Sequence, residues 1–91
     1  MNESKKNQDW FVYIIEAENG YLYTGITTCL EKRFSSHSLK KTGAKFFHFS
    51  KPKQIVYIQK LSSRSEASKQ EAYIKSLSKL EKLALIQKYH D

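Results

Sequence analysis

The chain has 91 residues and a formal net charge of +7, with 16 Lys or Arg against 9 Asp or Glu. A chain of this length forms one small domain with little room for a deep pocket, so a shallow surface site is favoured. Its single cysteine excludes an internal disulfide and a paired-thiol zinc motif, and we expect a cytoplasmic protein because no signal peptide or membrane-spanning segment is recognisable.

Residues 1–9 are polar and predict a disordered leader, followed by a single domain over residues 10–91. An unbroken apolar and aromatic run at the start of this domain predicts a strand near residues 10–16, buried on both faces. The Asn19-Gly20 pair favours a two-residue hairpin turn with both residues in the left-handed region. A second strand is expected near residues 21–26.

Tyrosines are frequent in this hairpin, at positions where Val or Ile would pack as well. They are Tyr13, Tyr21 and Tyr23. A buried phenol needs a polar partner for its hydroxyl group. These residues therefore either fill a small core or contribute their hydroxyl groups to a site.

Three Ser/Thr-x-x-Glu patterns of the capping-box type predict helix starts. They are Thr28 to Glu31, Ser63 to Glu66 and Ser78 to Glu81. We expect the corresponding helices to end near residues 39, 77 and 88. The β-branched and aromatic segment 54–61 predicts a third strand between the first and second helices. The order β-β-α-β-α-α predicts an α+β domain in which helices flank a three-stranded antiparallel sheet.

Apolar residues at helical spacing predict the face that each helix buries against the sheet. They are Leu30 and Phe34 in the first helix, Ala67, Ile74 and Leu77 in the second, and Leu80, Leu83 and Ile86 in the third.

A strongly basic stretch without any acidic residue runs from Lys32 to Lys53. Its basic residues are Lys32, Arg33, Lys40, Lys41, Lys45, Lys51 and Lys53, and it also contains Phe46, Phe47 and Phe49. Cations interleaved with aromatic rings are typical of surfaces that bind a polyanion with stackable bases. The alternatives are a solubilising loop above core phenylalanines and, with weaker support, an anionic membrane surface. We favour nucleic acid, because both signals fall within one segment.

Arg33 and His37 lie four residues apart, so their side chains leave one face of the first helix. Because this helix directly follows the tyrosine hairpin, we expect that face to meet Tyr13 and Tyr23. Arginine grips two phosphate oxygens at once, and histidine exchanges a proton near neutral pH. For an isolated Arg-His pair the alternative is a solvated helix face.

Glu71 is the acidic residue of the helical half that capping does not explain, since Glu66 and Glu81 open helices. We therefore interpret it as the candidate carboxylate for a metal ion. The alternative is an ordinary surface pair of Glu71 with Lys75, which stabilises a helix by about 0.3–0.5 kcal/mol.

These motifs follow one another along the chain as Val12-Tyr13, Tyr23-Thr24-Gly25, Arg33 with His37, and Glu71. In this order they resemble the GIY-YIG nuclease superfamily, most closely its small stand-alone, UPF0213-like bacterial members. The resemblance extends from Trp10 to Leu83. The chain departs from the superfamily pattern in having no asparagine after Asn19, where many of these nucleases carry one downstream of the glutamate.

The resemblance implies a hydrolase that cuts phosphodiester bonds with one divalent ion, Mg²⁺ or Mn²⁺, held by Glu71. It implies that Tyr13 is the general base or positions the attacking water, and that Tyr23 orients the water or the phosphate. Arg33 would neutralise charge on the phosphate oxygens, and His37 would hydrogen-bond the tyrosine and help to take its proton. A phenol with a pKa of about 10 is a base at neutral pH only if positive charge stabilises the phenolate, which we expect from Arg33, the metal and the lysines.

We therefore expect a metal-dependent endonuclease that acts on DNA, single-stranded or structured, with RNA left open as a substrate and with no small-molecule organic cofactor. Gly25 is expected to let the backbone approach the helix start. The residues expected to contact nucleic acid are Gly25, Lys32, Lys40, Lys41, Lys45, Phe46, Lys51 and Lys53. The alternatives are a non-catalytic nucleic-acid-binding module that keeps the nuclease fold, and a small adaptor that docks on a protein.

Overall fold

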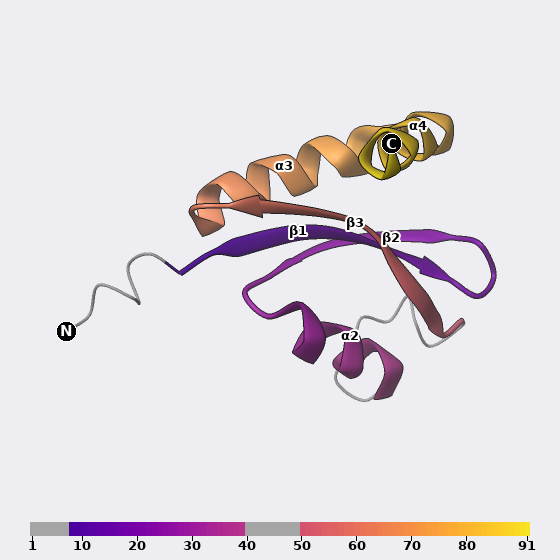
Figure 1. Ribbon diagram of the computed structural model, residues 1–91, viewed down its shortest axis with the longest axis horizontal. Coiled ribbons are helices and arrows are strands. Elements are labelled where there is room, and N and C mark those ends of the chain that lie inside the picture. The colour runs from indigo at the N-terminus through magenta and orange to yellow at the C-terminus, as the bar shows by residue number, and fades with distance from the viewer. Residues whose placement is uncertain (1–7, 40–49) are drawn as a thin grey trace.

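The computed structural model describes residues 8–39 and 50–91 (Figure 1). Its elements are β1 (Trp10–Ala17), β2 (Leu22–Thr27), α2 (Leu30–Leu39), β3 (Pro52–Leu61), α3 (Arg64–Ser76) and α4 (Lys79–His90). The predicted order β-β-α-β-α-α and the α+β class are confirmed. Residues 1–7 of the predicted leader lie outside the described residues, as do the candidate contacts Lys40, Lys41, Lys45 and Phe46.

The three strands form an antiparallel sheet in the order β2-β1-β3, so β1 is the central strand. Its apolar run is buried on both faces, as predicted: Val12, Tyr13, Ile14 and Ile15 are each at most 1% exposed. Tyr13 stands opposite Gly25 in β2 on one side and Ile58 in β3 on the other. The first tyrosine of the hairpin is thus held from both sides at the centre of the sheet.

Helices cover the two faces of the sheet unequally, with α2 on one face and α3 and α4 on the other (Figure 1). Because successive side chains of a strand point to opposite faces, β1 contributes to two cores. Val12 and Ile14 pack with Ala67 and Ile74 of α3. The other core contains Tyr13, Ile15 and Ala17, with Leu30 and Phe34 of α2 packed against it as predicted. The ring of Tyr13 therefore belongs to the α2 side.

The hairpin turn is one residue longer than the predicted two-residue turn, which was wrong. Gly20 N–H donates to the Ala17 carbonyl at 2.9 Å, and Ala17 N–H donates to the Tyr21 carbonyl at 2.9 Å. Gly20 alone among the described glycines has a positive φ, of 88°. This pattern is a three-residue loop that closes on a left-handed glycine. Asn19 contributes its side chain instead, since its Oδ1 accepts from Tyr21 N–H at 3.1 Å.

The starts of the two C-terminal helices confirm their predicted caps. Ser78 and Glu81 form a complete capping box at α4. At α3, Ser63 Oγ accepts from Glu66 N–H, as predicted. The Glu66 carboxylate, however, accepts from the backbone N–H and the hydroxyl of Ser62, one residue before the cap. The box at α3 is therefore shifted by one residue on its carboxylate side.

The predicted capping box between Thr28 and Glu31 does not describe the start of α2. The first helical carbonyl is that of Cys29, which accepts from Arg33 N–H at 3.1 Å. The hydroxyl that serves this junction belongs to Thr27, whose Oγ1 accepts from Cys29 N–H at 3.1 Å. Because β2 continues to Thr27, the chain turns into the helix one residue later than the pattern predicts.

Helix α4 buries only part of the face that its sequence predicts: Ile86 is confirmed, whereas Leu80 and Leu83 are not. Leu80 is 79% exposed and Leu83 is 44% exposed, whereas Ile86 and its neighbour Leu85 pack against the core beside α3. The second half of the helix is also tied to the sheet, because His90 Nε2 lies 2.8 Å from the Val56 carbonyl. The first turn is therefore left in solvent. Within the described ranges, α3 and α4 included, no helix has the length and apolarity to cross a membrane.

Candidate active site

The phenol of Tyr13 lies directly over Gly25, its partner across the β1–β2 pair. A Cβ atom added at Gly25 would stand 2.5 Å from Tyr13 Oη and 2.7 Å from Cζ, too close for any side chain. The three atoms nearest to that Cβ position all belong to Tyr13. Gly25 itself is buried. The space that this glycine opens is therefore filled by the phenol, which gives Gly25 a packing role at the site.

His37 holds the hydroxyl of Tyr13 from the α2 side. Its Nε2 lies 3.1 Å from Tyr13 Oη, and the His37 side chain is fully buried. Burial, together with the nearby charge of Arg33, lowers the pKa of His37 to about 4. The ring is therefore neutral at pH 7, so one nitrogen donates a hydrogen bond and the other accepts one. The Tyr23 ring packs edge-on against His37, with centroids 5.1 Å apart.

Arg33 interacts with both tyrosines, because each of them contributes to the pKa of its guanidinium. Burial lowers the pKa of Arg33, but its interactions with Tyr13 and Tyr23 outweigh this and raise the pKa above its usual value. The predicted convergence of Arg33 and His37 on the tyrosine hairpin is thus present in the structure. The solvated helix face is the wrong interpretation for this pair, since His37 is buried and Arg33 is half-buried.

Without a bound metal ion, Tyr13 is a neutral phenol at pH 7. Burial raises the pKa of Tyr13 to about 12, and hydrogen bonding to Arg33 offsets only part of that effect. Arg33 alone is therefore not enough to make Tyr13 a base at neutral pH. Sequence reasoning predicted that this strand is buried, but it weighed only the positive charges around Tyr13 and not the effect of burial on its pKa.

Glu71 approaches this cluster from α3, although α3 covers the opposite face of the sheet. It lies on the same side of the helix as the buried Ala67 and Ile74, and its side chain is 23% exposed. Its negative charge is close enough to contribute to the raised pKa of Tyr13. It also pairs with Lys75 at 3.3 Å, which is the alternative that the sequence left open. The surface pair is thus present, and the metal-binding role of Glu71 stays a prediction.

The donor set around Glu71 suits a magnesium ion better than a metal that needs a protein cage. Across residues 8–39 and 50–91 no three His, Cys, Asp or Glu side chains gather to hold a metal. Mg²⁺ keeps several of its waters and binds through one or two carboxylates together with phosphate oxygens. The partly exposed carboxylate of Glu71 fits that mode of binding.

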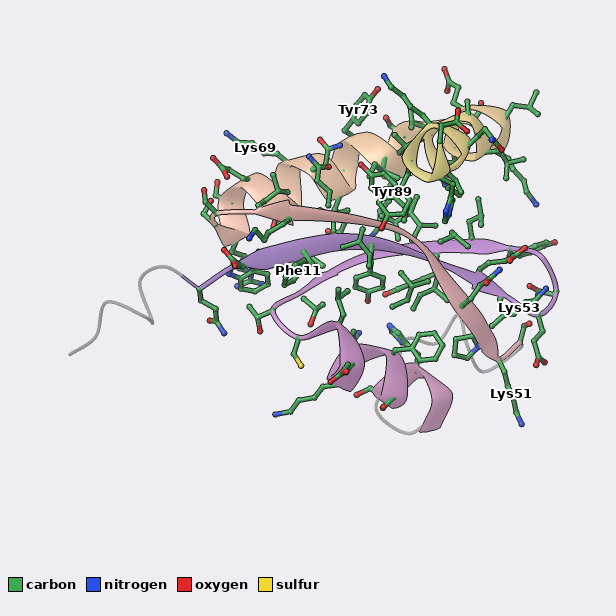
Figure 2. All side chains as sticks on the ribbon, viewed as in Figure 1. Phe11, Lys51, Lys53, Lys69, Tyr73 and Tyr89 are labelled. Atoms are coloured by element: carbon green, nitrogen blue, oxygen red, sulfur yellow. The ribbon has the colours of Figure 1, made fainter. Side chains whose placement is uncertain are left out.

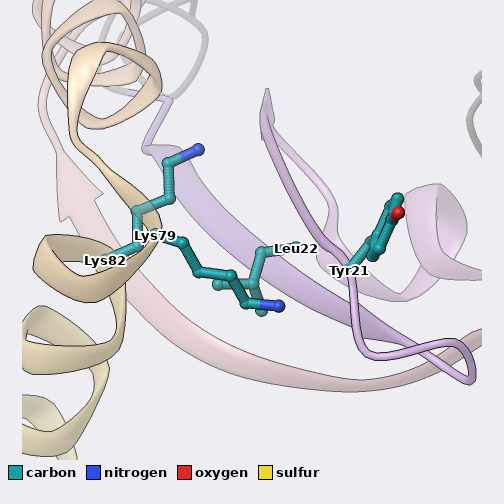
Figure 3. A pocket seen from close by; sticks show the side chains of 4 residues that line it. All are labelled: Tyr21, Leu22, Lys79 and Lys82. Atoms are coloured by element: carbon teal, nitrogen blue, oxygen red, sulfur yellow. The ribbon is translucent and has the colours of Figure 1, made fainter.

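The described lysines that were expected to contact nucleic acid are exposed. Lys32 is exposed on α2. Lys51 and Lys53 are exposed at the start of β3 (Figure 2). Sequence reasoning passed over Lys79 and Lys82, which line a hollow beside Tyr21 (Figure 3). No local pattern links these lysines to Tyr21, because they are far from it in the sequence.

Known proteins resemble this chain in sequence and in fold. The profile of the GIY-YIG catalytic domain matches residues 9–84. UPF0213 proteins of Desulfotalea psychrophila and of Pseudomonas aeruginosa PAO1 are each 43% identical to it over 77 residues, which is 85% of this chain and 70% and 73% of those proteins. The solution NMR structure of a UPF0213 protein from Bacillus halodurans is 34% identical, with a TM-score of 0.56, and the match covers 87% of this chain and 83% of that one. On this evidence, the chain belongs to the GIY-YIG catalytic domain family and to its UPF0213 members.

Proposed function

We propose that this protein is a divalent-metal-dependent endonuclease that hydrolyses phosphodiester bonds of DNA, single-stranded or structured. The proposal is carried by one observation: Tyr23 of β2 and Arg33 and His37 of α2 gather around Tyr13 of β1, and Glu71 of α3 lies close enough for its charge to act on it. Membership of a family of nuclease domains supports the same class of reaction. The residues in these roles are Tyr13, Tyr23, Arg33, His37 and Glu71.

Arg33 is suited to hold the phosphate. Its guanidinium carries five donors in a planar fork that matches two phosphate oxygens. The guanidinium already interacts with Tyr13 and Tyr23 before any substrate arrives, which favours a fixed position and reduces the side-chain freedom lost on binding. Negative charge that builds on the phosphate oxygens during hydrolysis would meet a fixed positive group.

Tyr13 is suited to orient the attacking water as a neutral phenol. In the tautomer in which His37 Nε2 accepts, Tyr13 donates its proton to the ring, and a lone pair of its oxygen can accept a hydrogen bond from water. As the water attacks, its proton can pass to Tyr13 while the phenol proton passes to His37. This relay needs no free phenolate, which the raised pKa of Tyr13 disfavours, but it places a proton on His37, which the lowered pKa of that ring opposes. Tyr23, in contact with His37, limits the orientations that the ring can take.

Glu71 is the residue that would hold the ion. A bound Mg²⁺ or Mn²⁺ would supply Lewis-acid stabilisation of the phosphate and of the leaving oxygen. Lys75 pairs with this carboxylate at 3.3 Å when no ion is bound, so the ion would have to displace the ammonium group.

The second candidate is a nucleic-acid-binding module without catalysis. The Glu71–Lys75 pair favours it, since a carboxylate already matched by a lysine has less need of a metal. The raised pKa of Tyr13 favours it as well. Under this alternative, binding would depend on salt and would be indifferent to Glu71.

The test compares cleavage by the wild type and by Glu71→Gln. Purified protein is incubated with labelled single-stranded, duplex and branched DNA, with Mg²⁺ or with EDTA, and products are resolved on denaturing gels. We expect Mg²⁺-dependent nicking that Glu71→Gln abolishes while DNA affinity is retained. Glu31→Gln, which removes an exposed carboxylate from α2, is the matched control and should cleave normally. Equal cleavage by the two variants, or none by the wild type, would refute the proposal.

A further inference from the structure

The hollow between the hairpin and the start of α4 combines an exposed aromatic ring with two cations (Figure 3). It has a volume of about 260 Å³ and is lined by Tyr21, Leu22, Lys79 and Lys82. Small-molecule pockets usually enclose about 300–1,000 Å³. This hollow is smaller than such pockets, and its size suits a single flat group laid against a surface.

Tyr21 presents an unusually large open ring for a residue beside a strand. Tyr21 is 61% exposed, which places it among the exposed large hydrophobic residues of the described chain. Lys79 is held next to this ring: its Nζ lies 5.8 Å from the ring centroid and donates to the Gly20 carbonyl at 3.3 Å. The cation is therefore positioned beside the aromatic face and does not extend freely into solvent. Lys82 adds a second positive charge one turn along α4.

Charge and shape together identify the occupant. Among the described residues that line the hollow two are lysines and none is a carboxylate, so the hollow attracts an anion. An exposed tyrosine beside them offers a stacking surface for an unpaired base, and base–aromatic stacking does not depend on sequence. A base paired within a duplex cannot reach such a ring without leaving its stack.

The position of the hollow relates it to the candidate active site. Tyr21 directly precedes β2, which is an edge strand, and Tyr23 lies two residues further along, about 7 Å in extended chain. A strand of DNA bound at Arg33 can thus continue along this edge.

We propose that Tyr21, Lys79 and Lys82 form a subsite for an unpaired nucleotide flanking the cleaved bond, with its base stacked on Tyr21 and its phosphate beside the two lysines. The inference rests on the proposed function, which gives DNA as the class of ligand. It adds the path that the DNA strand follows over the protein. It predicts a preference for single-stranded segments over continuous duplex.

Binding is measured by fluorescence anisotropy in EDTA, in the Glu71→Gln background, so that cleavage does not interfere. The probes are a labelled poly-dT strand of about 12 nucleotides and an abasic strand of the same length. We expect Tyr21→Ala to weaken poly-dT binding about 5- to 100-fold and Tyr21→Phe to change it less than about twofold, because the ring alone stacks. On the abasic strand Tyr21→Ala should bind like the parent, since no base is present to stack.

The matched controls come from the outer side of α3, where Lys69 and Tyr73 point away from the sheet (Figure 2). Tyr73→Ala and Lys69→Ala remove an exposed tyrosine and an exposed lysine and should leave the affinity unchanged. Lys82→Ala should weaken binding to both strands and reduce the dependence of log affinity on log salt by about one.

The subsite is refuted if Tyr21→Ala binds poly-dT as tightly as the parent, if its loss is equally large on the abasic strand, or if Tyr73→Ala shows the same loss. It is also refuted if the parent does not bind either strand. Binding with the full Tyr21 pattern but no cleavage by the wild type would overturn the nuclease proposal and support the subsite. The two proposals therefore fail separately.

Discussion

Gly25→Ala tests the closest contact of the candidate site. The new Cβ would stand 2.5 Å from Tyr13 Oη and 2.7 Å from Cζ, where ordinary contacts begin at 3.4 Å, so the ring must move by about 1 Å. Tyr13 is 1% exposed and its hydroxyl is tied to His37, which leaves it no free direction. Overpacking of this kind costs about 1–3 kcal/mol. Urea denaturation of the wild type and the variant measures this cost as a shift of the midpoint at constant slope.

A double-mutant cycle with Tyr13→Leu isolates the contact from general damage. Removing the ring relieves the clash, so we expect a favourable coupling of about 0.5–3 kcal/mol between Gly25→Ala and Tyr13→Leu. Tyr13→Phe should relieve little, because Cζ remains at 2.7 Å.

Gly20→Ala is the control for the loss of a glycine as such. At this position a Cβ meets nothing within 4 Å, and the positive φ of 88° alone causes a loss of about 1–2 kcal/mol. Its effect should add to that of Tyr13→Leu within about 0.5 kcal/mol. Our account of the site is refuted if Gly25→Ala unfolds at the same urea concentration as the wild type, or if it too is merely additive with Tyr13→Leu.

Two further expectations concern stability. The pKa of His37 is lowered from 6.5 to about 4, so between these pH values the unfolded chain binds a proton that the folded chain does not. The stability that this shift contributes is complete above pH 6.5. It falls by on the order of 3 kcal/mol as the pH drops from 6.5 to 4. Urea denaturation at several pH values should show a smaller loss for His37→Asn, and an equal loss in both proteins would contradict the buried neutral ring. Ile74→Ala, in the α3 core, should cost about 2–5 kcal/mol, whereas Leu80→Ala, with the side chain 79% exposed, should change stability by less than about 0.5 kcal/mol. Comparable losses for these two variants would mean that α4 packs as its sequence pattern predicts and not as the structure shows.

Local chemistry determined most of the secondary structure. The apolar run of β1 has to be buried on both faces because it offers no polar face, and it forms the central strand. Ser78 and Glu81 satisfy amides within the first turn of α4, so their effect is complete within four residues. The spacing of Arg33 and His37 places them on one face of α2 wherever the helix packs. From such features the sequence predicts the fold class. It also predicts that four of the five candidate catalytic residues, Tyr13, Tyr23, Arg33 and His37, lie together.

Local patterns were insufficient where burial or a helix boundary depended on the element that packs against the segment. Leu80 and Leu83 have helical spacing, but the sheet meets α4 through Leu85 and Ile86, and spacing alone does not say where a partner surface ends. Thr28 has the right residue three positions ahead, yet β2 runs on to Thr27 and moves the helix start.

The electrostatics of the site likewise depended on tertiary structure. Nearby cations are visible in the sequence and lower the pKa of a phenol, whereas burial raises it, and only the packing of Tyr13 beneath α2 made burial the larger effect. The same holds for distance: Glu71 affects Tyr13, and Lys79 lies beside Tyr21, although some sixty residues separate each pair. Sequence by itself determined which side chains were available and which helix or strand carries each one. Their environment and their neighbours were decided by the tertiary structure, because desolvation and contact arise only when distant segments pack together.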